Sequence, residues 1–304
     1  MQVFEFKRYY IIMINMPGSY WIVYYLYRLN QPVPMALILS KIQIYPIKSC
    51  GGISLSSSKA ESRGLQYDRR WMLIDVIGRC ITQRESSAMA LMRIELHKDC
   101  LVVYHTDEVD DQILVPFLNA EELSNSPRLE VTLWDDICEA IVYPDFINKW
   151  FSNKINMDCR LVYMPDDSIR KVDPRYAADG EITSFSDGYP ILLLGQASLD
   201  DLNQRMADPI PINRFRPNLV FTGGAPYQED DIESFTIDKV QMKGVKLCAR
   251  CNIPTINQDT GISKSEPTAT LATYRLVDKK ILFGQNVLIK NPGTIKIGDE
   301  LVIH

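Results

Sequence analysis

The sequence predicts a strand-rich α+β fold, and three observations along its 304 residues support that class. Short apolar runs alternate with polar residues, which is the period of a half-buried strand. Glycine and aspartate turn signals separate these runs at a spacing typical of hairpins. Only a few segments carry apolar residues at helical spacing. Repeated hairpins of this kind favour a barrel or a strongly curved sheet.

The first clear strand lies in ALILSKIQIYPIKS, residues 36–49, where Ile42 and Ile44 alternate with Lys41 and Gln43. This alternation predicts one buried and one exposed face. Three hairpins are predicted after it. They lie in residues 69–83 with a turn at Gly78, in 93–105 with a turn at Lys98-Asp99, and in 129–143 with a turn at Asp135-Asp136.

A helix and a long polar loop are predicted next. PDFINKWFSNKIN, residues 144–156, carries Phe146, Trp150 and Phe151 at helical spacing, which predicts a helix that faces the core. Residues 164–190 are rich in Asp, Ser and Gly. Because loops of this length in compact domains tend to be functional or disordered, this stretch is expected to divide the chain into two halves.

The second half again reads as strands with one helix. ILLLGQASLDDLNQRM, residues 191–206, predicts a strand and then a helix capped by Ser198, with Asp201 in its first turn. NLVFTGG predicts another strand. The last segment, residues 291–303, predicts two strands separated by a turn at Gly298-Asp299.

The composition excludes some classes of function. Hydrophobic residues make up 46% and charged residues 23%, as in an ordinary soluble globular protein. The net charge of −5 argues against nucleic-acid binding, because neutralising phosphates requires a basic face. Any cationic site in this chain is therefore local, and it suggests a small anionic ligand.

Residues 1–36 are predicted to be an extension ahead of the first domain. YYIIMINMPGSYWIVYYLYRL, residues 9–29, carries one charge and is nearly long enough to span a bilayer, but Asn15 and Pro17 interrupt it. Three interpretations stay open: an over-extended start or loosely docked arm, a membrane anchor or interfacial segment, and a true part of the domain. Contact with a membrane is expected only if residues 9–29 act as an anchor.

The seven cysteines do not form a disulfide framework, because their number is odd and their spacing irregular. No secretory cleavage signal stands out. We therefore expect reduced thiols and a cytoplasmic protein. The chain has only three histidines, so no cluster of histidine ligands is expected.

Cys248 and Cys251 stand three residues apart in VKLCARCNIPTINQDTG. A structural zinc site needs four ligands, and a thioredoxin-type pair should open a helix, whereas Pro254 and the residues after it indicate loop and strand. A pair of core thiols also remains possible. The fourth reading is a single thiolate that serves as a soft metal ligand, favoured by cations such as Arg250 and Lys246 nearby.

Several polar clusters lie at the ends of predicted strands, and each alone also fits a solvated turn. They are Lys48 and Ser49 in YPIKSCGG, Arg69 in YDRRWML, Arg216 and Asn218 in INRFRPNLVF, Asp187, Gly188 and Tyr189 in FSDGYP, and Gln285 and Asn286 in LFGQN. A curved sheet could gather Lys48, Arg69 and Arg216 around one phosphate, since guanidinium groups bind phosphate through paired hydrogen bonds.

These clusters match a known family. YPIKSCGG, DRRWML, FSDGYPILLLGQASLDDLN, NRFRPNLVF, CARCNIPTINQDTG and LFGQNVLIKNPGTIKIGDELVI resemble the MOSC proteins that begin with a MOSC-type β-barrel. Among these, the chain is similar to the mitochondrial amidoxime-reducing components and to bacterial members that act on N-hydroxylated base analogues. The resemblance implies an N-terminal β-barrel domain over residues 37–160 and a MOSC domain over residues 161–304.

The resemblance also implies a function. Such proteins use a molybdenum cofactor of the molybdopterin type to reduce small N-hydroxylated compounds, with electrons from an external donor such as a ferredoxin, a flavin reductase or a cytochrome b5-like protein. Matching motifs make Cys251 the molybdenum ligand and Asp187 a proton donor or orienting group. The implied cofactor contacts are Lys48, Ser49, Arg69, Gly188, Tyr189, Arg216, Asn218, Gln285 and Asn286. A non-redox carrier of the cofactor or of sulfur is the alternative.

Overall fold

The computed structural model describes residues 2–6, 9–13 and 36–304 of the chain. Strands β1 (Gln2–Phe6) and β2 (Tyr9–Met13) form an antiparallel pair. Of the predicted arm or anchor over residues 9–29, everything after residue 13 lies outside the described residues. Within the described ranges, no helix is long and apolar enough to cross a membrane. Residues 36–304 form one compact unit.

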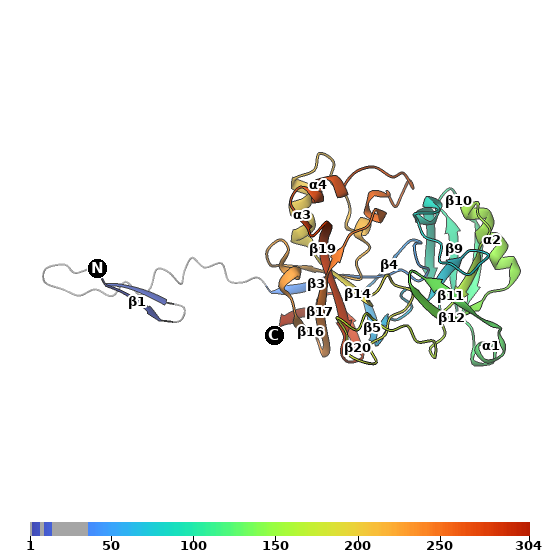
Figure 1. The fold of residues 1–304 in the computed structure, drawn as a ribbon, viewed down its shortest axis with the longest axis horizontal. Coiled ribbons are helices and arrows are strands. Elements are labelled where there is room, and N and C mark those ends of the chain that lie inside the picture. The colour runs from blue at the N-terminus through green and yellow to red at the C-terminus, as the bar shows by residue number, and fades with distance from the viewer. Residues whose placement is uncertain (1, 7–8, 14–35) are drawn as a thin grey trace. The chain divides into compact units, whose positions relative to one another are not determined.

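A closed seven-stranded barrel contains most strands of the second half (Figure 1). Its strands pair in the order β14-β15-β3-β21-β16-β17-β19, and β19 pairs back with β14. They are β3 (Leu37–Ile44), β14 (Ile191–Gly195), β15 (Leu219–Thr222), β16 (Ser234–Ile237), β17 (Val240–Ala249), β19 (Lys280–Ile289) and β21 (Glu300–Ile303). Two short strands, β4 (Ile53–Leu55) and β18 (Leu276–Val277), pair with β3 and β19.

Strand β3 shows why the sequence forms this barrel. Ile42 and Ile44 are fully buried in the barrel core, whereas Lys41 before them is exposed and Gln43 between them is partly exposed, as the alternation predicts. The strand pairs with β15 on one side and with β21 on the other. A strand that comes first in the compact unit therefore joins strands from its far end.

The strands of the first half form two further sheets and a small one. The four-stranded sheet is built from β7 (Trp71–Ile74), β11 (Arg128–Leu133), β12 (Asp136–Val142) and β13 (Arg160–Tyr163). The first three-stranded sheet holds β8 (Met92–Leu96), β9 (Cys100–His105) and β10 (Glu108–Pro116). The second holds β5 (Ser57–Glu61), β6 (Gly64–Leu65) and β20 (Gly293–Lys296), which comes from the far end of the chain.

Four α-helices lie on these sheets in the described part of the chain: α1 (Ala120–Asn125), α2 (Asp145–Ile155), α3 (Gln196–Gln204) and α4 (Thr268–Ala272). In Figure 1, α2 lies beside β9 and β10, and α3 and α4 lie together near β19. Short 3-10 helices span Ser87–Leu91, Ile212–Phe215, Gln228–Asp231 and Ile253–Thr255. The strand-rich α+β class is thereby confirmed.

The hairpin predictions are largely right. The turn at Gly78, where φ is +87°, connects β7 to a return arm that is held by a single bridge from Ile74 to Cys80. The hairpin of β8 and β9 turns at residues 97–99, as expected. The third hairpin is shifted by one residue: Leu133 pairs with Asp136, so its turn is Trp134-Asp135 and not Asp135-Asp136.

Two predictions about the helices were wrong. Helix α2 buries Ile147, Phe151 and Ile155, whereas the Phe146 side chain is 62% exposed. The buried stripe therefore follows the i, i+4, i+8 spacing, which Phe146 does not share.

Ser198 is not a helix cap, because α3 begins at Gln196 and its N-cap is Gly195. The buried Ser198 hydroxyl instead donates a hydrogen bond to Glu229 and accepts one from the Tyr227 amide.

The predicted long loop is confirmed between β13 and β14, where residues 164–190 contain no helix or strand beyond one bridge. Strands before and after this loop share sheets, as β3 and β20 show. The predicted domain ranges 37–160 and 161–304 therefore stay a prediction about how the chain is divided.

Candidate functional site

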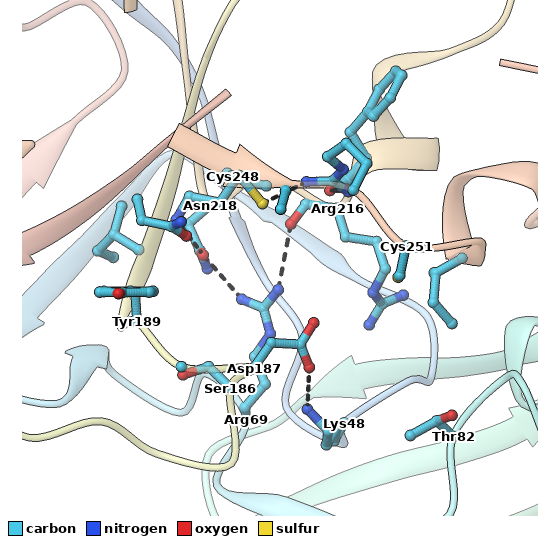
Figure 2. A pocket seen from close by; sticks show the side chains of 18 of the residues that line it. Lys48, Arg69, Thr82, Ser186, Asp187, Tyr189, Arg216, Asn218, Cys248 and Cys251 are labelled. Atoms are coloured by element: carbon cyan, nitrogen blue, oxygen red, sulfur yellow. Dashed lines mark hydrogen bonds and ion pairs between the residues drawn. The ribbon is translucent and has the colours of Figure 1, made fainter. Parts of the chain in front are cut away.

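A cavity of about 260 Å³ lies where the barrel meets loops of the first half. Figure 2 shows Lys48 and Thr82 facing Cys248 and Cys251 across it. Its charged lining consists of six cationic side chains and one carboxylate, namely Lys48, Arg69, Arg84, Arg216, Lys246, Arg250 and Asp187. In a chain whose net charge is −5, this is a local concentration of positive charge.

The cavity gathers ten of the eleven residues that the sequence singled out. Ser49, Gly188, Tyr189, Asn218, Asn286 and Cys251 line it together with Lys48, Arg69, Asp187 and Arg216. Gln285 does not line it. Its side chain is buried behind β19 and donates to the Ile232 carbonyl at 3.5 Å, because successive residues of a strand point to opposite faces.

Three of the cationic or hydroxyl residues stand on left-handed backbone. Ser49, Arg69 and Arg216 have φ of +67°, +48° and +54°. Such conformations cost side-chain-bearing residues about 1–3 kcal/mol each and concentrate at functional sites. All three lie in loops between elements: Ser49 between β3 and β4, Arg69 just before β7, and Arg216 between a 3-10 helix and β15.

Lys48 and Asp187 form an ion pair across the cavity, with Nζ 2.6 Å from Oδ1 (Figure 2). The Lys48 ammonium holds the pKa of the Asp187 carboxyl well below its usual range. Lys48 is buried, whereas the Asp187 side chain is 75% exposed, so solvent weakens the pair. Asp187 is ionised at neutral pH, which suits an orienting group better than a proton donor.

Arg69 is already committed to protein partners. Its Nη1 donates to the buried Asp68 carboxylate at 2.6 Å and to the Asn218 amide oxygen at 2.9 Å. Its Nη2 donates to the Arg216 carbonyl at 3.3 Å. Arg69 and Asn218 therefore fix the position of Arg216 as much as they offer donors to a ligand.

Arg216 has donor capacity left. Its guanidinium lies 4.1 Å from the centroid of the Tyr45 ring, and burial lowers its pKa to about 10, which leaves it protonated at neutral pH. Its Nη2 is buried and has no hydrogen-bond partner among the described residues. A buried donor without a partner costs free energy unless a ligand or water satisfies it.

The two cysteines have different surroundings. Arg250 Nη1 donates to Cys248 Sγ at 3.1 Å, and burial raises the pKa of the Cys248 thiol. Cys251 follows the end of β17 and lies beside Arg84. Burial opposes the charge on Arg84, but the Cys251 thiol and the Asp187 carboxylate raise the pKa of its guanidinium.

Sequence reasoning missed four residues of the site. Thr82, Arg84 and Trp134 line the cavity from the first half of the chain. Buried Arg170 donates to the carbonyls of Ser184 and Ser186 and so holds the turn that carries Asp187. Two arginines in the polar loops were the available signal, but many surface loops contain arginine, and only the fold identifies these.

The lining fits an anionic cofactor that carries its own metal. Arg216 and Arg250 each have a buried donor that finds no partner in the described part of the chain, and such donors suit phosphate or a heterocycle with acceptors, while the half-buried Cys251 offers sulfur, a soft ligand. In residues 2–6, 9–13 and 36–304, no three His, Cys, Asp or Glu side chains lie close enough to hold a metal ion.

Comparison with known proteins identifies the family. Residues 36–158 match the MOSC N-terminal beta barrel domain, and residues 181–302 match the MOSC domain. Mitochondrial amidoxime-reducing component 1 of Mus musculus is 32% identical over 283 residues, which cover 87% of this chain and 82% of that protein. The chain belongs to the MOSC family.

Other MOSC relatives have the same level of identity. Mitochondrial amidoxime-reducing component 1 of Homo sapiens is 32% identical over 87% of this chain and 82% of its own length. The molybdenum cofactor sulfurase of Oryza sativa subsp. japonica is 32% identical over 81% of this chain, which spans 32% of that protein. This MOSC protein is thus related to proteins that are named for amidoxime reduction and for the molybdenum cofactor.

Proposed function

We propose that this MOSC protein binds a molybdopterin-type molybdenum cofactor and reduces small N-hydroxylated compounds with electrons from a separate donor. One observation carries the proposal: Cys251 shares a single cationic cavity with Lys48, Arg69 and Arg216. The names of the mammalian relatives, which are amidoxime-reducing components, support the reaction class.

The residues that the sequence singled out and the cavity gathers have these roles in the proposal. Lys48, Ser49 and Arg216 bind the cofactor phosphate and ring, and Arg69 with Asn218 holds Arg216 in place. Gly188, Tyr189 and Asn286 line the pterin, and Cys251 ligates the metal. When bound, the cofactor supplies the two-electron chemistry that removes oxygen from an N–O bond.

The Lys48 ammonium group carries a proton at Nζ, and the Asp187 carboxylate in the cavity lining accepts a hydrogen bond from it. A carboxylate fixed at 2.6 Å from an ammonium can accept a hydrogen bond from a substrate N–H or O–H group and orient it. Cleavage of the N–O bond by two electrons consumes two protons, one taken up by the leaving hydroxyl group to form water and one by the nitrogen, and the ordered ion pair in the cavity lining gives them a route.

In this proposal the two electrons come from a separate donor, because each turnover oxidises the cofactor and the cofactor must be reduced again before the next one. A ferredoxin, a flavin reductase or a cytochrome b5-like protein fits this role. If the loaded protein reduced its substrate with NADH alone, the external donor would not be needed.

Turnover of benzamidoxime with reduced methyl viologen, by protein purified from a host that makes the cofactor, tests the function. We expect benzamidine formation by the wild type, none by Cys251→Ala, and wild-type rates for the control Cys100→Ala, which lies in β9 away from the cavity. Full molybdenum loading without any turnover would reject the reductase.

That last result would favour a second function, a non-redox carrier of the cofactor or of sulfur. The specific support for it is the similarity to the rice molybdenum cofactor sulfurase over most of this chain. A carrier is expected to release bound cofactor to an apo-enzyme on mixing, whereas a reductase keeps it through repeated turnovers.

A further inference from the structure

The Trp134 side chain forms an aromatic part of the cavity wall, and it is not among the proposed cofactor contacts. It lies in the turn between β11 and β12, whereas Cys251 comes from the barrel. Its side chain lines the cavity and is 41% exposed. A large indole with this much free surface at the edge of a polar cavity is available to a ligand.

The backbone at Trp134 is unfavourable for a bulky residue. Its φ is +58°, at the first position of a two-residue hairpin turn, where Gly, Asn or Asp is favoured. Stability alone would select a small residue at this position. A strained residue beside a functional cavity points instead to a role in function.

Two cations hold the indole in place. The Arg84 guanidinium lies 4.7 Å and the Lys48 ammonium 5.5 Å from its ring centroid. Lys48 pairs with Asp187, and Arg84 also lies beside the Cys251 thiol. The indole therefore contacts the proposed proton-holding pair through Lys48, and it contacts Arg84, which lies beside the proposed metal ligand.

A second aromatic group lines the same cavity. Tyr189, which precedes β14, packs edge-to-face on Tyr176 at 6.2 Å between ring centroids. Lys246 lies over the Tyr176 ring at 4.4 Å, which ties this pair to β17. An aromatic residue from each half of the chain thus lines the cavity that holds Cys251.

We propose that Trp134 is a specificity-determining residue that selects planar, conjugated N-hydroxylated compounds, whose rings pack against its indole, over aliphatic ones. This inference rests on the proposed reductase function and names its substrate class. A flat ring gains stacking energy on the indole, whereas a small alkyl group gains little. The N–OH group, common to both classes, then lies on the side of Lys48 and Asp187.

The kinetic test compares benzamidoxime with acetamidoxime, two neutral substrates that share the N–OH group. In Trp134→Gly we expect KM for benzamidoxime to rise about tenfold and KM for acetamidoxime to stay within about twofold. Trp134→Phe keeps an aromatic face and retains most of the preference. Ile137→Ala, at a 64% exposed position of the same hairpin outside the cavity lining, changes neither substrate.

Two further readouts do not depend on turnover. Glycine accepts a φ of +58°, so Trp134→Gly keeps or raises Tm, by about 2 °C. Adenine, a planar ring without an N–OH group, binds the wild type more tightly than Trp134→Gly in calorimetric titration, again by about tenfold.

The outcomes separate this inference from the function on which it rests. If adenine binding depends on Trp134 but neither amidoxime is reduced, the role of Trp134 in binding planar rings is supported and the reductase function is rejected. Reduction with an unchanged benzamidoxime to acetamidoxime ratio in Trp134→Gly overturns the selectivity. A lower Tm together with equal losses on both substrates overturns it too, because the indole would then be structural.

Discussion

At the scale of single residues, the Lys48–Asp187 pair decides the protonation state of the carboxyl group that lines the cavity. The pair joins a loop of the first half to the turn before β14. Sequence alone marked Asp187 as either proton donor or orienting group. The ammonium at 2.6 Å favours the second role, because a carboxyl with a depressed pKa stays ionised well below neutral pH.

This assignment predicts the pH dependence of the Asp187→Asn variant. Since Asp187 is ionised throughout pH 5–8, the ratio of wild-type to variant kcat/KM is expected to be constant over that range. Profiles of kcat/KM against pH for both proteins measure the ratio. A wild-type activity limb near neutral pH that disappears in Asp187→Asn would show that the carboxyl donates a proton after all.

Arg216 has a buried donor without a partner among the residues that the structure describes, which suits an anionic ligand. Arg216→Gln removes one charge-assisted contact of about 1.5–3 kcal/mol, so cofactor retention should fall roughly 10- to 100-fold. Pterin content after successive rounds of gel filtration measures this. The control Arg128→Gln removes an exposed arginine that pairs with Glu139 and Asp167, and it should retain the cofactor fully. Equal retention in both variants would remove Arg216 from the site.

At the scale of elements, helix α2 shows the limit of predicting a buried helix face from sequence patterns. The aromatic pattern alone could not rank Phe146 against Phe151, since both residues occur in the same helical run. Packing decides, because Phe151 is fully buried and Phe146 is 62% exposed. Phe151→Ala is expected to destabilise the fold by about 3–5 kcal/mol and Phe146→Ala by less than about 0.5 kcal/mol. Urea unfolding of both variants measures this, and equal losses would contradict the assigned face.

Glu229, which contacts α3, makes the free energy of unfolding depend on pH. It is fully buried, its Oε2 accepts a hydrogen bond from Ser198 at 2.8 Å, and burial raises its pKa to about 7. A raised acid pKa favours the folded state below the unfolded value of about 4.5, and this stabilisation is lost as pH rises through about 7.

The wild type should therefore lose roughly 3 kcal/mol of unfolding free energy between pH 4.5 and 8 relative to Glu229→Gln, which stays neutral throughout. Denaturant titrations of both proteins at several pH values give the difference. Parallel pH profiles would mean that Glu229 does not titrate in this range.

Local patterns were a good guide to strands and a poorer guide to their ends. Alternation placed Ile42 and Ile44 in the core, and Gly78 marked a turn. The turn at Trp134 was missed because a tryptophan with positive φ contradicts turn preferences. Gln285 was assigned to the cavity beside Asn286, although adjacent strand residues point to opposite faces. A positive φ that is rare for tryptophan explains the first error, and the alternation of side chains along a strand explains the second.

At the scale of the whole molecule, the site depends on long-range pairing that no local pattern reveals. Strand β3 closes the barrel between β15 and β21, and the loop that follows it carries Lys48 and Ser49 to the cavity. The motifs identified most of the lining, and only the closed sheet explains why it converges. Arg84 and Trp134 were identified as lining residues only from the fold.

The central claim is that Cys251, among two neighbouring thiols, ligates molybdenum within this cationic cavity. Molybdenum and pterin content per chain, for wild type, Cys251→Ala and Cys248→Ala purified from a cofactor-making host, tests it most directly. We expect about one molybdenum per chain in the wild type and in Cys248→Ala, and almost none in Cys251→Ala. Full molybdenum in Cys251→Ala, or none in the wild type, would contradict the claim.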